Sequence, residues 1–179
     1  VGTCRQIYAV LLLAGCMASC LCAAATTAEE GLVAYYTFDE GDTATAFDHS
    51  GNGNDGAIHN GRLLGTRSGH CLELDGRTSY VDCGNGPTLD LTKQLTMAAW
   101  VYVAGRPMGE PGIMGKQFSS FLLTYYKTGH VYGYINSGGN NANAPMGMGR
   151  WCHLAMTFDG ATIRLYLNGL QAAEKASQA

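Results

Sequence analysis

The feature that most constrains the fold is a pair of alternating apolar segments joined by an Asp-Gly turn. Residues 152–158 and 162–167 each carry apolar side chains at every second position, and Asp159 and Gly160 stand between them. Alternation with a period of two is typical of a strand with one buried face. Asp-Gly favours the primed turns whose twist matches a hairpin. The sequence therefore predicts a β-hairpin here.

Similar short segments recur along the chain. Predicted strands lie at 31–38, 72–74, 80–83, 95–103, 113–116, 121–126 and 131–135. Residues 72–74 and 80–83 are predicted to pair as a hairpin around Asp75-Gly76, and residues 136–149 to form a long mobile loop. With 25 glycines and only 14% charged residues, about nine short strands indicate an all-β antiparallel sandwich rather than a helical bundle or a parallel sheet.

The first residues have the order of a secretory leader. A basic residue precedes the apolar run 7–13, and small residues follow. The run is shorter than the roughly 20 residues that a membrane span needs. Residues 13–16 resemble a bacterial lipobox, which predicts lipidation of Cys16, while residues 23–25 offer an ordinary signal-peptidase site as the alternative. We expect a leader over residues 1–25, cleaved before Cys16 in the lipoprotein case, and an extracytoplasmic location in a bacterium: secreted, periplasmic or lipid-anchored.

Three cysteines lie in the expected folded part, an odd number that cannot pair fully within one molecule. Strand alternation turns Cys71 outward and Cys83 inward, and these directions exclude a disulfide between the two. Cys83 and Cys152 are interpreted as small core residues.

Six segments together resemble the bacterial laminin-G-like jelly-roll family, within the concanavalin A-like lectin and glucanase superfamily. They are 32–40, 48–56, 72–76 with 80–82, 95–101, 151–160 and 165–169. The resemblance implies a concanavalin A-like jelly roll over residues 31–179. The family continues past a turn such as Asn168-Gly169 with a strand, a glycine-rich connection and a final strand. None of these is visible here, so we expect the domain to be C-terminally truncated and to lack its last strands.

An acidic, glycine-rich loop at residues 39–56 is the candidate metal site. In domains that resemble this one, the same loop holds one structural calcium ion. Carboxylate, hydroxyl and amide oxygens are the ligands that Ca²⁺ prefers. The predicted ligands are Asp39, Asp48, Ser50 and Asn52. The alternative is a turn whose side chains cap its own backbone.

The chain is not expected to be an enzyme. Glucanases of this superfamily carry Glu-x-Asp-x-x-Glu on one strand, but here Glu73 and Asp75 are followed by Thr78, so the array is incomplete. Nucleophile-elbow, zinc-protease and P-loop motifs are absent from the sequence.

The candidate ligand-binding residues are aromatic. Alternation turns Trp100, Tyr102 and Tyr166 outward, where their rings can stack on sugars. The alternative for the tryptophans is packing under loops or a neighbouring sheet. We predict a non-catalytic binding or adhesion module that recognises a glycan or an extracellular protein. A structural accessory domain of a larger secreted glycosidase or sialidase is the alternative. Scattered Lys and Arg and a net charge of -3 argue against a nucleic-acid partner.

Overall fold

A computed structural model describes residues 7–10, 31–107, 109–117, 120–136 and 139–177 of the chain. The predicted leader and its candidate lipidation residue Cys16 lie outside the described residues, except for the four at 7–10. The strands are β1 (Ile7–Val10), β2 (Thr45–Ala46), β3 (Gly56–His59), β4 (Arg62–Thr66), β5 (Gly69–Leu74), β6 (Tyr80–Asp82), β7 (Leu95–Val103), β8 (Gly112–Gln117), β9 (Phe121–Tyr126), β10 (His130–Ile135), β11 (Asn141–Pro145), β12 (Trp151–Phe158), β13 (Thr162–Leu167) and β14 (Leu170–Ala176). A single 3-10 turn, Pro87–Leu89, interrupts them. The described residues include no helix with the length and apolarity of a membrane span.

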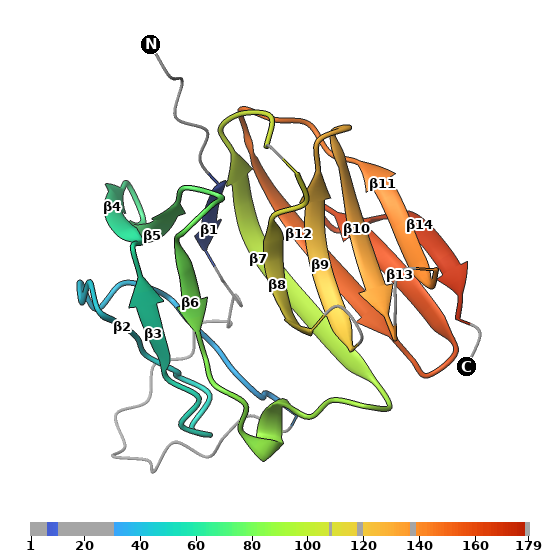
Figure 1. The fold of residues 1–179 in the computed structure, drawn as a ribbon, viewed down its shortest axis with the longest axis horizontal. Helices are drawn as coiled ribbons and strands as arrows, with labels where there is room; N and C mark the ends of the chain where they lie inside the picture. Colours follow the sequence, from blue (N-terminus) through green and yellow to red (C-terminus); the bar gives the residue numbers. More distant parts are fainter. Residues whose placement is uncertain (1–6, 11–30, 108, 118–119, 137–138, 178–179) are drawn as a thin grey trace, which may run out of the picture.

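The strands form an antiparallel sandwich. A seven-stranded sheet has the order β14-β13-β12-β7-β1-β5-β4, and a four-stranded sheet, β11-β10-β9-β8, lies against it (Figure 1). A small third sheet, β2-β3-β6, stands beside them. The all-β sandwich predicted from the sequence is confirmed.

The main core lies between the two larger sheets. In β7, every second residue from Leu95 to Val103 is buried, and the residues between them are half-buried or exposed. Buried residues of β9, β10 and β11 meet those of β7, β12 and β13 in one cluster. Leu123, Val131, Leu154 and Ile163 are all fully buried within it. Burial of alternate apolar residues from both sheets is therefore what holds the sandwich together.

A second, smaller core sits near the third sheet. Phe38, Ala46 and Leu72 are its buried members, with Tyr36 and Ile58 packed against them. The N-terminal part of the folded chain thus has its own apolar cluster.

Most strands of the main sandwich fall where the sequence places them. β7, β9 and β13 have the predicted bounds, and β12 begins one residue earlier. The strand judged to be missing after Asn168-Gly169 is present as β14. For this one strand the prediction was wrong, because the Ala-, Gln- and Lys-rich composition of β14 suits an edge strand with exposed side chains rather than a buried one. The expected lack of the glycine-rich connection and final strand stays a prediction.

The predicted opening strand at 31–38 is not a strand. Its backbone groups bond to the following loop instead of to a neighbouring strand. Tyr35 accepts a bond from the His49 N–H and donates its own N–H to Asp48. Phe38 then takes a left-handed φ of 62°, which ends extended geometry.

Two other predictions also fail. The chain between β5 and β6 does not make a hairpin, because Asp75 accepts the N–H groups of Arg77, Thr78 and Ser79. After this compact turn, β6 pairs with β3 in another sheet. The predicted mobile loop contains β11, which pairs with β10.

The three cysteines among the described residues, Cys71, Cys83 and Cys152, are free thiols. Cys71 is paired in register with Leu64, whereas its neighbour Leu72 is paired with Leu63 of the smaller core. Cys71 therefore lies on the face away from that core, as predicted, but it is buried there. Cys152 belongs to the main core, as predicted.

Candidate functional site

Four rings gather on the outer face of the seven-stranded sheet. β7 and β12 are antiparallel neighbours whose register places Trp151 opposite Tyr102 and His153 opposite Trp100. Each pair meets edge to face, with ring centroids 5.6 Å apart in the first and 5.4 Å in the second. We call these four residues the aromatic block. Its geometry is that of favourable aromatic pairs.

Strand alternation explains why the block faces outward. Ala99, Val101 and Val103 of β7 point into the core, so the two residues between them point away from it. Trp151 is the most open member, with 39% of its surface exposed. The structure thus confirms the predicted outward direction of Trp100 and Tyr102 and brings them together.

Trp151 and His153 are not among the three ligand-binding residues predicted from the sequence, although the alternation of residues 152–158 does turn His153 outward. Their place in the block follows from the β7–β12 register, which no local turn signal fixes. The third predicted residue, Tyr166, lies one strand further along, on β13 opposite Ala155. It is half-buried and borders the block.

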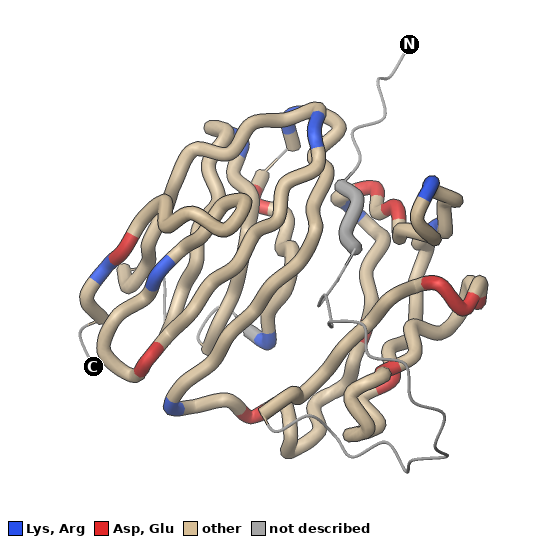
Figure 2. Tube along the Cα trace, turned by 180° about the vertical axis from the view of Figure 1, so that it is seen from behind, with Lys and Arg blue, Asp and Glu red and all other residues tan. Residues whose placement is uncertain are grey.

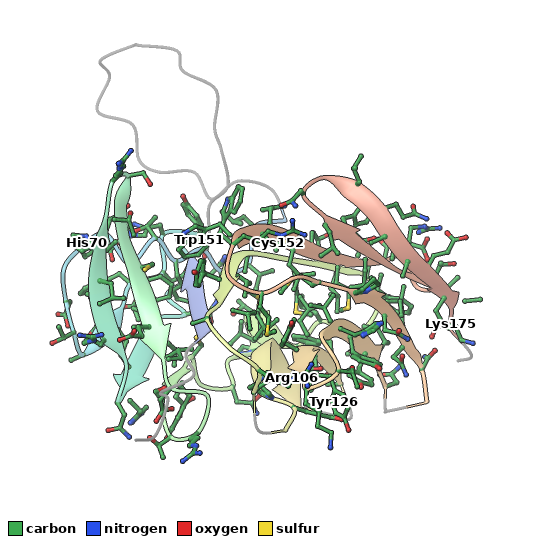
Figure 3. All side chains as sticks on the ribbon, turned by 90° about the horizontal axis from the view of Figure 1, so that it is seen from above. His70, Arg106, Tyr126, Trp151, Cys152 and Lys175 are labelled. Carbon is green, nitrogen blue, oxygen red and sulfur yellow. The ribbon has the colours of Figure 1, made fainter. Side chains whose placement is uncertain are left out.

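The opposite face of the molecule carries a second aromatic group. Tyr132 and Tyr134 on β10 stack at 5.8 Å and 11°, and Tyr126 on β9 meets Tyr132 edge to face. We call these three residues the tyrosine row. Figure 3 shows Tyr126 and Trp151 on opposite sides of the sandwich. Tyr134 is only 6% exposed, and burial, reinforced by the nearby Glu110 carboxylate, raises its pKa.

The acidic loop is organised around one carboxylate. Asp48 accepts the N–H groups of Tyr35, Ser50 and Asn54 and the Ser50 hydroxyl, at 2.8–2.9 Å. Burial acts to raise the pKa of Asp48, but the hydrogen bonds from Ser50, Tyr35 and Asn54 outweigh it, so the pKa is lowered. Each of the two carboxylate oxygens accepts two bonds.

The neighbouring polar side chains reach back to the opening segment. Asn52 and Asn54 donate to the Val33 carbonyl, whose oxygen also lies 3.0 Å from the Ser50 hydroxyl oxygen, and Asn52 donates to the Leu32 carbonyl as well. These side chains therefore replace the strand partner that residues 31–38 lack.

As arranged, the predicted calcium ligands do not fit a metal site. Asp48, Ser50 and Asn52 lie together, but hydrogens of the chain already point at the Asp48 oxygens. Asp39 instead accepts the N–H of His70. Among the described residues, no three His, Cys, Asp or Glu side chains form a metal-binding group. The contacts favour the backbone-capping alternative, and calcium binding stays a prediction.

Comparison with known proteins decides the family. The sequence profile described as the concanavalin A-like lectin/glucanases superfamily matches residues 75–179, which is more than half of the chain. The chain belongs to this superfamily. No curated protein and no solved structure gives a significant match.

In this concanavalin A-like domain, the two carboxylates of the incomplete glucanase-type array, Glu73 and Asp75, make structural contacts. Glu73 is 5% exposed and bound by the Arg62 guanidinium at 2.6 Å. Asp75 holds the turn after β5, and its pKa is strongly lowered by hydrogen bonds, first from Ser79 and then from the backbone of Arg77. Each carboxylate therefore has a structural partner, but the predicted hairpin-surface position does not hold, because Glu73 is buried and β6 pairs with β3 instead of β5.

Charged residues of the concanavalin A-like domain are dispersed. Figure 2 shows Lys and Arg spread singly along the trace, with Asp and Glu between them. Several basic residues form ion pairs with nearby acidic residues, such as Arg164 with Asp159 and Lys116 with Asp90. The described surface therefore lacks the basic stripe of a nucleic-acid interface.

Proposed function

We propose that this concanavalin A-like domain is a non-catalytic, extracytoplasmic glycan-binding module whose binding surface is the aromatic block. The observation that carries the proposal is the exposed Trp151 ring, held edge to face against Tyr102 on a rigid strand pair. An apolar ring face suits the C–H face of a pyranose, while indole, phenol and imidazole groups supply hydrogen bonds at the edge.

Pre-organisation supports this surface. The rings stand on β7 and β12, whose inner residues are locked in the main core. Rings fixed in this way lose little conformational entropy when a ligand binds. The tyrosine row is less suited, because Tyr134 is buried and only Tyr126 and Tyr132 remain partly open.

The engaged carboxylates support a non-catalytic role. A glycosidase of the two-carboxylate type needs one acid free to protonate and another free to attack or to activate water. Glu73 is ion-paired and Asp75 caps a turn. The secretory character of the first residues supports an extracytoplasmic location.

Glycan-array binding with the full chain tests the proposal. Trp151→Ala is expected to weaken binding of the best ligand by about tenfold or more, through the lost stacking surface. Tyr80→Ala is the matched control, because Tyr80 is an exposed tyrosine on another sheet. Tyr132→Ala probes the tyrosine row.

Loss of binding in the Trp151 variant alone supports the aromatic block. Unchanged binding in that variant with loss in the Tyr132 variant moves the site to the other face. An array without any bound glycan contradicts glycan recognition altogether.

A further inference from the structure

An interior position of the seven-stranded sheet, next to the central strand β7, is filled by a strand from the extreme N-terminal region. β1 pairs antiparallel with both β5 and β7. In the described structure it is the one strand that joins the β14-β13-β12-β7 half of this sheet to the β5-β4 half. β1 therefore supplies the hydrogen-bond partners for the backbone N–H and C=O groups along one edge of β5 and one edge of β7.

β1 covers only part of the available edge. Its four residues are in register with Trp100 to Val103, the second half of the nine-residue β7. Within the described residues, no strand pairs with Leu95–Ala99 on this side. An exposed strand edge of this kind offers N–H and C=O groups to an added strand.

A cavity of about 1120 Å³ opens beside this uncovered half. Leu95 and Met97 of β7 line one side, and Val81 of β6 and Val33 line another. Phe121 and Phe158 from the main core also border it. The lining is largely apolar and includes Leu95 to Ala98, on the part of β7 that β1 leaves uncovered. We call the place of β1 between β5 and β7, together with this cavity, the groove.

We propose that this groove between β5 and β7 is a strand-acceptor site. Its occupant is the predicted leader segment that starts with β1 at Ile7, and this segment binds there even when it is supplied as a separate peptide. Recognition combines backbone pairing along two strand edges with apolar contacts in the cavity, the mode of β-augmentation. On β7, Ala98 and Met97 lie just before the residues that pair with β1, and both line the cavity, so a longer peptide that continues along this edge gains the cavity contacts.

Hydrogen exchange on the full chain tests the site. Ala9→Pro is expected to displace β1 from between β5 and β7, because proline lacks the N–H that a strand with two neighbours must donate. Exchange in the segments 71–74 and 100–103 should then be faster by about tenfold or more. Thr3→Pro, the same kind of change outside β1, is the control and should leave these segments unaffected.

Addition of a synthetic peptide provides the second step. A lysine-flanked peptide with the sequence of residues 7–13 should restore protection in the Ala9→Pro protein, while a scrambled peptide should not. A peptide of residues 7–10 alone should bind at least about tenfold more weakly, because it leaves the cavity unfilled.

Three results would overturn the proposal: unchanged exchange in the proline variant, no effect of the added peptide, or equal affinity of the two peptides. Ala9→Gly keeps the backbone N–H and gives a milder version of the same readout if the proline variant does not fold. Because the measurement does not use glycans, it fails or succeeds independently of the proposed glycan binding.

Discussion

At the scale of single residues, Asp48 has the widest structural role in the N-terminal region. Its carboxylate ties residues 35, 50 and 54 together, and the polar side chains around it hold the Val33 carbonyl. A half-buried carboxylate that accepts several N–H bonds stabilises a segment without a strand partner.

Replacing this carboxylate should be costly. Asp48→Asn turns an amide NH₂ toward groups that donate, so we expect a loss of about 1–3 kcal/mol in the free energy of unfolding. Urea denaturation measures it. Asp82→Asn is the control, since the exposed Asp82 accepts the N–H of Gly84 alone among the described bonds, and it should change stability far less. If calcium raises the melting temperature of the wild type but not of the Asp48 variant, the metal prediction regains support.

The lowered pKa of Asp48 also predicts acid sensitivity. A carboxyl whose pKa is lower in the folded state contributes stability above its unfolded pKa of about 3.9 and loses it as pH falls through the folded value. The wild type should therefore lose more stability than Asp48→Asn between neutral and strongly acidic pH. Denaturation series across this range test the difference. Parallel curves for the two proteins would contradict it.

At the scale of elements, the two large sheets pack closely against each other at Gly133 of β10. A Cβ placed there would collide with the Met156 side chain on β12 and would lie 3.0 Å from that of Leu165 on β13. Glycine at this position thus sets how tightly the sheets pack.

Gly133→Ala should destabilise the sandwich by about 1–3 kcal/mol through overpacking. Thermal unfolding measures the change. Gly65→Ala is the matched control, because its added Cβ meets nothing within 4 Å. A combined Gly133→Ala and Met156→Val protein should recover part of the loss, and additive losses would argue against a steric cause.

Sequence reasoning succeeded where one face of a strand is buried. β7 alternates cleanly along its whole length and β13 over most of its length, and the bounds of both strands and of β9 were predicted. It failed at residues 31–38, whose apolar residues look like a strand but whose backbone is bonded by side chains from the next loop. It also missed the partners of Trp100 and Tyr102, because β7 and β12 are distant in sequence and only the assembled sheet brings them together.

At the scale of the whole molecule, the chain has two apolar cores of unequal size. The larger lies between the main sheets, and the smaller contains Phe38, Ala46 and Leu72. Regions with few buried apolar contacts open at lower free energy than the main core.

Unfolding should therefore proceed from the smaller core. Native-state hydrogen exchange at low denaturant should show residues 44–59 opening before residues 151–167. Leu72→Ala should increase the difference in opening free energy between these two segments. Leu154→Ala should instead lower the global free energy of unfolding by about 2–5 kcal/mol. One shared opening free energy for both regions would show that the cores are a single cooperative unit.

The place of β1 in the sheet also sets an order of events during synthesis. Residues 7–10 leave the ribosome early, yet their partner β7 is complete only when Val103 has been made. Throughout that interval residues 7–10 cannot pair with β7. The residues of β1 can take their place in the sheet only after Val103 has emerged, so under the predicted secretory role an export factor would have to capture them before then.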